Sequence, residues 1–141
     1  DQDRAADFCR LDGTAAVVTG SSSGMGRAIA WELARGGARL VVHCRNSVDS
    51  AEELVDSIRS SGGEAELMVA DLSDPVEADA MLESSWQALG QVDAWINNAG
   101  VDLLTGAEAG WEFDEKLAAL WEVDVRATIR LAREAGRRMR W

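Results

Sequence analysis

The chain has 141 residues, of which 47% are hydrophobic and 28% are charged, with 13 glycines and one proline. This length corresponds to about one domain, and the composition excludes a disordered chain and a fibrous repeat. The net charge of −11, from 25 acidic and 14 basic side chains, disfavours non-specific binding to nucleic acid or to an anionic membrane.

Four short apolar runs alternate with four amphipathic stretches along the chain. The runs predict strands that are buried on both faces, because such strands read as nearly continuous apolar segments. The expected strands are Ala15–Thr19, Leu40–Cys44, Glu66–Ala70 and Ala94–Asn97. The expected helices are Gly24–Arg35, Ser50–Ser60, Pro75–Leu89 and Trp111–Met139, with Asp74 as the N-cap before Pro75.

This alternation predicts an α/β fold with a parallel sheet built from successive βαβ units. Right-handed crossovers favour a doubly wound, Rossmann-type sheet, in which we expect the strand order 3-2-1-4. Four βα units form about half to two-thirds of such a sheet. We therefore expect residues 1–141 to form a single, incomplete nucleotide-binding domain that is truncated after four βα units, with residues 1–10 as a flexible extension.

The turn after the first expected strand is rich in glycine and serine. It reads Thr-Gly-Ser-Ser-Ser-Gly-Met-Gly from Thr19 to Gly26 and opens a helix, whose free N–H groups and partial positive charge suit a pyrophosphate. A P-loop is excluded, because Met25 stands where its second glycine belongs and no lysine follows. The spacing Gly-x3-Gly-x-Gly also differs from the standard dinucleotide fingerprint, and an ordinary Ser/Gly loop is the alternative for this segment alone.

Three motifs together resemble the classical branch of the short-chain dehydrogenase/reductase family. The family's Thr-Gly-x3-Gly-x-Gly matches Thr19–Gly26, its Asn-Asn-Ala-Gly matches Asn97–Gly100, and its adenine-binding pair matches Asp71-Leu72. The motifs follow the expected strands in the family's order, and the similarity runs from about Leu11 to Arg140. The resemblance implies an oxidoreductase, similar to 3-oxoacyl-carrier-protein reductases and to sugar or steroid dehydrogenases, that transfers hydride between a nicotinamide cofactor and a carbonyl or alcohol carbon.

The resemblance assigns cofactor contacts to the motif segments and to the end of the second strand. The expected residues are Gly20, Ser22, Ser23, Gly24, Met25, Gly26, Arg45, Asp71, Leu72, Asn98, Ala99 and Gly100. Asp71 is expected to accept from the adenine amino group, with a role as a helix cap as the alternative. Asn97 and Asn98 are expected to tie strand ends together and to bind a ribose, because an amide side chain both donates and accepts.

The end of the second strand distinguishes the two nicotinamide cofactors. An acidic side chain there binds the ribose 2′-hydroxyl and repels a 2′-phosphate, but His43-Cys44-Arg45-Asn46-Ser47 contains no acid before Asp49. Arg45 is placed to pair with a phosphate, so NADP(H) is favoured over NAD(H), with a merely solvated Arg45 as the alternative. His43 is interpreted as a buried structural residue, because no nucleophile is paired with it.

The resemblance also implies a catalytic serine and a Tyr-x3-Lys pair on a fifth strand and the helix after it. The chain contains no tyrosine, so we expect it to be inactive alone and the parent protein to be the enzyme. The family's helical asparagine corresponds here to Asp124, for which a relay role and a purely structural role are both open. The stripe Leu117, Trp121, Asp124, Thr128, Leu131 and Ala135 is expected to face inward.

The remaining expectations concern partners and location. No apolar run approaches the roughly 18 residues of a membrane span, and Cys9 and Cys44 lack the spacing of a metal site. We expect a cytoplasmic protein with a small carbonyl or alcohol substrate, no metal, and a homo-oligomeric full-length form. The alternative is a non-catalytic nucleotide-binding or assembly module that lacks the Tyr-x3-Lys active site.

Overall fold

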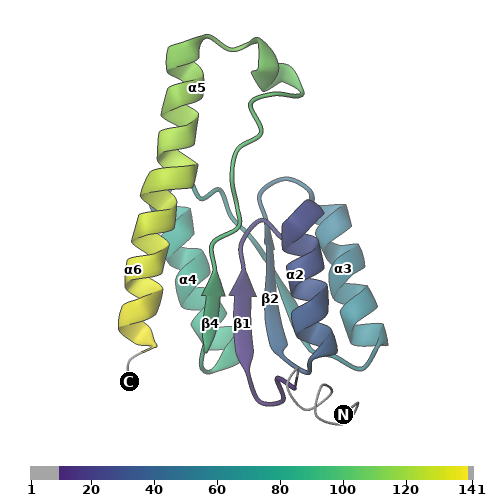
Figure 1. The fold of residues 1–141 in the computed structure, drawn as a ribbon. Coiled ribbons are helices and arrows are strands. Elements are labelled where there is room, and N and C mark those ends of the chain that lie inside the picture. The colour runs from purple at the N-terminus through teal and green to yellow at the C-terminus, as the bar shows by residue number, and fades with distance from the viewer. Residues whose placement is uncertain (1–9, 140–141) are drawn as a thin grey trace, which may run out of the picture.

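The computed structural model describes residues 10–139, which form a parallel sheet between two layers of helices (Figure 1). The strands are β1 (Ala15–Val18), β2 (Arg39–Cys44), β3 (Ala65–Val69) and β4 (Ala94–Ile96), in the order β3-β2-β1-β4. The predicted α/β class and strand order are confirmed. The expectations for residues 1–9, for Arg140 and for Trp141 lie outside the described residues.

Helices cover both faces of the sheet. Helices α2 (Gly24–Arg35) and α3 (Val48–Ser60) pack on one face, and α4 (Pro75–Leu89) and α6 (Thr128–Arg138) lie on the other. Successive residues of β1 point to opposite layers, as the pleat of a strand requires. Ala16 and Val18 join the core with α2 and α3, whereas Ala15 and Val17 face the layer of α4. All four are fully buried, which explains why this strand is wholly apolar.

Helix α6 is held against α4 and β4 by aromatic and charged side chains. The rings of Trp86 on α4 and Trp95 on β4 are stacked, with their centroids 5.9 Å apart. The Arg138 guanidinium lies over the Trp86 ring, 5.5 Å from its centroid, and pairs with Glu83 at 2.8 Å. Arginine commonly combines such a cation–π contact with an ion pair. These contacts attach the last helix to the sheet.

The ends of the helices follow the predicted signals with small shifts. Asp74 is the N-cap of α4, and its carboxylate accepts from the Val76 amide at 2.8 Å, as expected. Helix α3 begins at Val48, two residues earlier than predicted, after Ser47.

The predicted single helix Trp111–Met139 is wrong in detail. A 3₁₀ turn, η1 (Ala107–Gly110), precedes this segment. The segment itself contains α5 (Phe113–Leu120), a π-helical segment, η2 (Trp121–Ala127), and α6. Leu131 and Ala135 are buried as expected, but Leu117 and Trp121 are 50% and 58% exposed. Figure 1 shows the reason: α5 extends beyond the ends of the strands, where there is no sheet to pack against. The i→i+5 bonds of a π-helix also shift the helix face relative to a regular α-helix.

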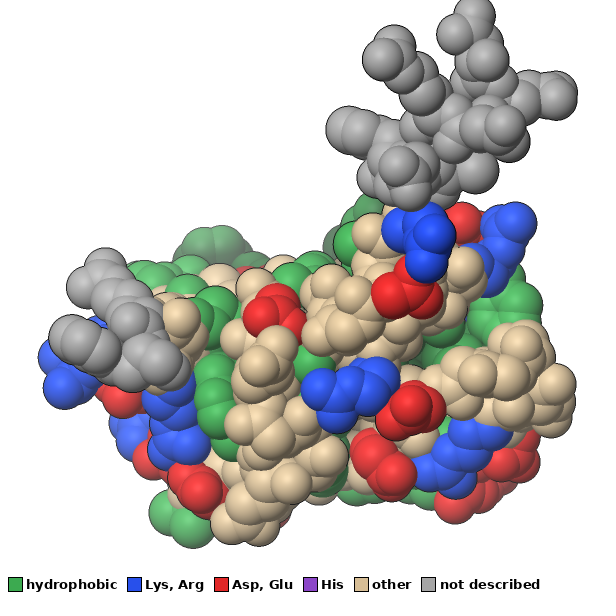
Figure 2. All heavy atoms as spheres, turned by 90° about the horizontal axis from the view of Figure 1, so that it is seen from below, with side chains coloured by type: hydrophobic (Ala, Val, Ile, Leu, Met, Phe, Trp, Pro, Cys, Tyr) green, Lys and Arg blue, Asp and Glu red, His purple; other side chains and the backbone are tan. Residues whose placement is uncertain are grey.

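Opposite charges are mixed at the amino ends of the strands. Figure 2, which views the molecule from this side, shows Lys or Arg and Asp or Glu side chains lying beside one another. Arg10 pairs with Asp12 at 2.9 Å before β1, and Arg35 pairs with Glu32 at 3.0 Å where α2 ends. Within residues 10–139, no helix is long and apolar enough to cross a membrane.

We predict that the chain self-associates as its concentration rises, despite its charge of −11. Phe113, Leu117 and Trp121 expose apolar side chains on α5 and at the start of η2, and such a patch favours association. The β4 strand adds an edge, because β1 is the strand that it pairs with in the described sheet. Sedimentation velocity over a concentration series measures this association.

Substituting both Phe113 and Trp121 with glutamate is expected to lower the association. A Met25→Glu variant serves as the control, because Met25 is 78% exposed on α2, in the other helical layer. A wild-type chain that stays monomeric at high concentration contradicts the prediction, and equal effects of both variants contradict its assignment to α5.

Candidate functional site

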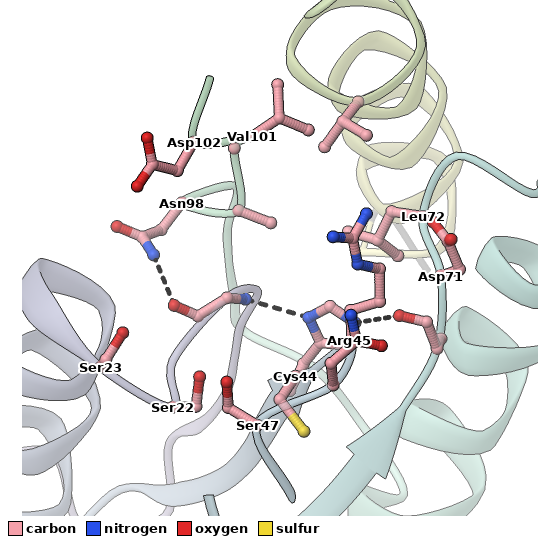
Figure 3. A pocket seen from close by; sticks show the side chains of 17 residues that line it. Ser22, Ser23, Cys44, Arg45, Ser47, Asp71, Leu72, Asn98, Val101 and Asp102 are labelled. Carbon is pink, nitrogen blue, oxygen red and sulfur yellow. Dashed lines mark hydrogen bonds between the residues drawn. The ribbon is translucent and has the colours of Figure 1, made fainter. Parts of the chain in front are cut away.

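A cavity of about 400 Å³ opens at the carboxyl ends of the strands (Figure 3). Ligands of open α/β sheets bind at this edge, and the volume falls within the roughly 300–1,000 Å³ of typical ligand pockets. Segments that follow all four strands line it. They include nine of the predicted cofactor residues, namely Gly20, Ser22, Ser23, Arg45, Asp71, Leu72, Asn98, Ala99 and Gly100.

The other three predicted residues, Gly24, Met25 and Gly26, form the first turn of α2 and are not among the residues that line the cavity. Gly26 is buried, and a Cβ there would overlap the Asn98 side-chain nitrogen and the Gly20 carbonyl oxygen. Gly20 has a φ of 62°, and a Cβ there would lie 2.7 Å from the Ala99 Cα. The two glycines therefore allow the loop after β1 to pack directly on the loop after β4.

Thr19 and Asn98 join the ends of β1 and β4. The Thr19 hydroxyl oxygen accepts from the Asn98 and Ala99 amides, both at 3.0 Å, and the hydroxyl donates to the Ile96 carbonyl at 3.3 Å. The Asn98 side-chain nitrogen donates to the carbonyls of Thr19 (3.0 Å) and Gly20 (2.9 Å). Asn98 thus makes the predicted tie between strand ends. Thr19 was missed as a site residue, although a polar residue at the end of an apolar run was a usable signal.

The three serines of the loop have different positions. Ser21 is fully buried; its hydroxyl donates to the Val18 carbonyl at 2.8 Å and accepts from the His43 amide at 3.0 Å. Ser22 and Ser23 line the cavity. Ser21 therefore holds the loop to β2, whereas Ser22 and Ser23 belong to the cavity wall.

His43 uses both ring nitrogens to bind backbone groups. Its Nδ1 accepts from the Gly20 amide at 2.9 Å, and its Nε2 lies 3.1 Å from the Ala70 carbonyl oxygen, to which it donates. Burial lowers the pKa of the imidazole, because desolvation disfavours the charged form. The interpretation of His43 as a satisfied structural residue is confirmed.

Arg45 follows β2 and Asp71 follows β3, and the two side chains lie near each other at the cavity (Figure 3). One Asp71 carboxylate oxygen accepts from the Ser73 amide at 2.9 Å and from the Ser73 hydroxyl at 2.7 Å. Partial burial raises the pKa of Asp71, but these hydrogen bonds and the charge of Arg45 outweigh it, so the pKa lies below its usual value. Asp74 is the cap of α4, so the alternative role for Asp71 as that cap is excluded.

Asp124 lies in η2 and faces the loop after β4. Its carboxylate accepts from the Val101 amide at 3.1 Å, and a Cβ on Gly100 would lie 3.1 Å from the same oxygen. Val101 and Gly100 both line the cavity, so Asp124 holds one of its walls. This contact is structural, and a part for Asp124 in proton relay stays a prediction.

The chemistry of the lining suits an anionic, hydrogen-bonding ligand. It offers serine hydroxyls, amide side chains and the Arg45 guanidinium, and it also contains the carboxylates of Asp71, which is held by Ser73, and of Asp102, which is held by Thr105. In the part of the chain that the structure describes, no group of three or more His, Cys, Asp and Glu side chains is arranged to hold a metal ion.

Comparisons with known proteins relate the chain to dehydrogenases and reductases. The sequence profile of a family described as short chain dehydrogenase matches residues 14–140. Elsinochrome reductase 1 from Elsinoe fawcettii is 37% identical over 126 residues, which are 89% of this chain and 46% of that protein.

Several similar solved structures contain NADP or NADPH. A short chain dehydrogenase from Burkholderia cenocepacia in complex with NADP has a TM-score of 0.82 and 35% identity, over 92% of this chain and 52% of that one. Landomycin C-6 ketoreductase LanV with bound NADP and rabelomycin has a TM-score of 0.79 and 32% identity, over 92% and 54%. The chain thus spans about half the length of each of these proteins.

We predict that Gly26→Ala destabilises the fold by about 1–3 kcal/mol, because the new methyl group must displace the loop after β4. Gly136→Ala is the matched control. Gly136 lies inside α6 with nothing within 4 Å of its Cβ position, so alanine there is expected to stabilise by about 0.5–1 kcal/mol. Urea unfolding followed by tryptophan fluorescence measures both changes. A Gly26→Ala chain as stable as the wild type would show that the loops are not closely packed.

Proposed function

Because the chain belongs to the short-chain dehydrogenase family, we propose that it is the NADP(H)-binding part of a reductase that transfers hydride between nicotinamide and a carbonyl or alcohol carbon. The observation that carries this proposal is the polar cavity at the carboxyl ends of the strands, which segments after all four strands line. Support also comes from the two similar proteins with bound NADP, one of which is a ketoreductase.

The loop Gly20–Ser23 is assigned to the pyrophosphate. Helix α2 begins directly after it, and its N-cap, Ser23, makes no side-chain capping hydrogen bond among the described residues. The first-turn N–H groups and the Ser23 hydroxyl are therefore available to an anion, which the helix dipole also favours. Arg27 adds a positive charge behind the loop, where its guanidinium donates to the Ser50 carbonyl at 2.8 Å and to the Ser22 carbonyl at 3.4 Å.

The adenosine end is assigned to the walls after β2 and β3. Asp71 and Leu72 are proposed to bind the adenine, and Arg45 to bind the 2′-phosphate that distinguishes NADP(H) from NAD(H). Arg45 is exposed at the cavity and Asp71 is held by Ser73, so the guanidinium is available to a phosphate.

The nicotinamide end is assigned to the loop Asn98–Gly100. The bound nicotinamide supplies the hydride, and the residues of this chain bind and orient the nucleotide beside the substrate. The proton donor and acceptor of the reaction are assigned to a serine and a Tyr-x3-Lys pair outside this chain, because it contains no tyrosine. The full protein is proposed to act as a homo-oligomer on a small carbonyl or alcohol compound.

A second candidate is a non-catalytic nucleotide-binding or assembly module. The absence of tyrosine from all 141 residues is the observation that favours it. The coding sequence after Trp141 separates the two candidates, because a serine and a Tyr-x3-Lys pair there indicate the reductase.

We predict that the 141-residue chain binds NADPH but does not oxidise it in the presence of a carbonyl compound. Loss of general acid–base catalysis alone lowers rates by about 10²–10⁴-fold, and lost substrate positioning lowers them further. Cofactor fluorescence measures binding, and absorbance measures turnover. A chain that does not bind NADPH contradicts the cofactor assignment, whereas carbonyl-dependent turnover contradicts the assignment of the acid–base groups to residues outside the chain.

The Arg45→Asp variant is predicted to bind NADPH less tightly relative to NADH, by about 1.5–3 kcal/mol, because a guanidinium partner is replaced by a repelling carboxylate. Arg133→Asp is the control, since it makes the same change of charge on the exposed face of α6. The measurement is the ratio of the NADPH and NADH dissociation constants for wild type, Arg45→Asp and Arg133→Asp. An unchanged NADPH/NADH ratio in Arg45→Asp means that Arg45 is a solvated charge only.

A further inference from the structure

We propose that His43 is a positioning residue of the nucleotide site, which holds the glycine-rich loop only as a neutral imidazole, so that nucleotide binding weakens when His43 is protonated. The inference rests on the proposed function, because it concerns the affinity of the same cavity.

His43 connects two walls of the cavity. It lies at the end of β2, between Gly20, the first cavity residue after β1, and Ala70, which precedes Asp71 after β3. Its Nδ1 accepts from the Gly20 amide at 2.9 Å and its Nε2 donates to the Ala70 carbonyl, 3.1 Å away. One ring therefore binds both the segment assigned to the pyrophosphate and the segment assigned to the adenine, beside the backbone hydrogen bonds from the Ser21 amide to the His43 carbonyl and from the Ala70 amide to the Cys44 carbonyl.

These two contacts require one protonation state of the ring. The Gly20 amide can only donate and the Ala70 carbonyl can only accept, so Nδ1 must carry no proton and Nε2 must carry one. Protonation of Nδ1 places an N–H group against the N–H group of Gly20. The loop cannot easily turn away, because the Gly20 carbonyl also accepts from Asn98 and the backbone of Gly20 packs on Ala99. The contact to Gly20 therefore changes from attractive to repulsive when His43 is charged, which strains the loop.

Few charges surround this ring. Asp71 faces it from the end of β3, Arg45 follows it on the loop after β2, and Glu77 of α4 accepts from the Asp71 amide. The glycine-rich loop, Gly20–Ser23, contributes no titratable side chain. Burial lowers the pKa of His43 more than the Ala70 hydrogen bond and the Asp71 charge raise it. The pKa of His43 thus lies below that of a free histidine, so the neutral ring is favoured and the loss of affinity is expected under acidic conditions.

The experiment compares wild type with His43→Asn and His43→Leu. The asparagine side chain does not titrate, yet its amide oxygen can accept from the Gly20 amide, whereas leucine removes the acceptor. Dissociation constants of NADP⁺ are measured by calorimetry from about pH 8 to about pH 5. The 2′-phosphate of the ligand itself takes up a proton near pH 6, as phosphate monoesters do. The ratio of the wild-type to the His43→Asn constant cancels this effect, because both chains bind the same ligand.

We expect this ratio to be constant above about pH 7 and to rise below the pKa of His43 by up to about tenfold per pH unit. His43→Leu is expected to bind about tenfold more weakly than wild type at pH 8, because the Gly20 amide has no acceptor. Equal pH profiles for wild type and His43→Asn overturn the proposal. Tighter wild-type binding in acid also overturns it, since the added positive charge would then attract the phosphates more than it disturbs the loop.

A second readout needs neither a ligand nor a variant. In NMR spectra of the ligand-free wild-type chain, the Gly20 amide shift and exchange rate should follow the titration of the His43 ring. A Gly20 amide that ignores this titration overturns the proposal. If NADP⁺ binds to none of the chains, the proposed function fails, while this readout still decides whether His43 positions the loop.

Discussion

The close approach of two loops, after β1 and after β4, is the constraint on which the site depends. It requires that Gly20 and Gly26 have no Cβ, because each Cβ would meet the loop after β4 or its Asn98 side chain. The hydroxyl of Thr19 and the amide of Asn98 then satisfy the backbone groups that this contact buries. Once the loops are joined, the first turn of α2 and the segment Asn98–Gly100 are fixed relative to each other. The cavity is the space that remains beside this joint.

The local chemistry of the cavity differs from the charge of the whole chain. A net charge of −11 repels an anionic ligand at long range. At the cavity, however, serine hydroxyls and the Arg45 guanidinium line the wall, Arg27 lies behind the glycine-rich loop, and the two carboxylates of the lining, Asp71 and Asp102, accept hydrogen bonds from Ser73 and Thr105. Short-range donors outweigh a distant net charge, because salt screens exposed charges beyond about 8–10 Å. The acidic surplus therefore disfavours partners that respond to the overall field, while the local donors of the cavity still favour an anionic ligand.

The sequence predicted the features that depend on local pattern. The strand order, the N-cap at Asp74 and the grouping of the motif residues at one sheet edge follow from strand periodicity and from known βαβ geometry. What the sequence did not predict depends on tertiary contacts. That Gly26 packs against the Asn98 side chain, that Ser21 is buried, and that Trp121 is exposed all reflect what lies opposite each residue. Helical periodicity gave Trp121 a place in the buried stripe, but it carries no information on where the supporting sheet ends.

The number of residues in the π-helical segment η2 affects the position of one wall of the cavity. It holds one more residue per hydrogen-bonded ring than an α-helix does, and it contains Asp124, which binds the loop after β4 through the Val101 amide. Removing one residue from η2 would restore regular α-helical bonding and turn everything on its amino-terminal side by about 100°. Insertions and deletions at this point would therefore matter as much as substitutions. Between homologues, a one-residue gap in an alignment here would mark a rearranged cavity wall rather than a neutral change of loop length.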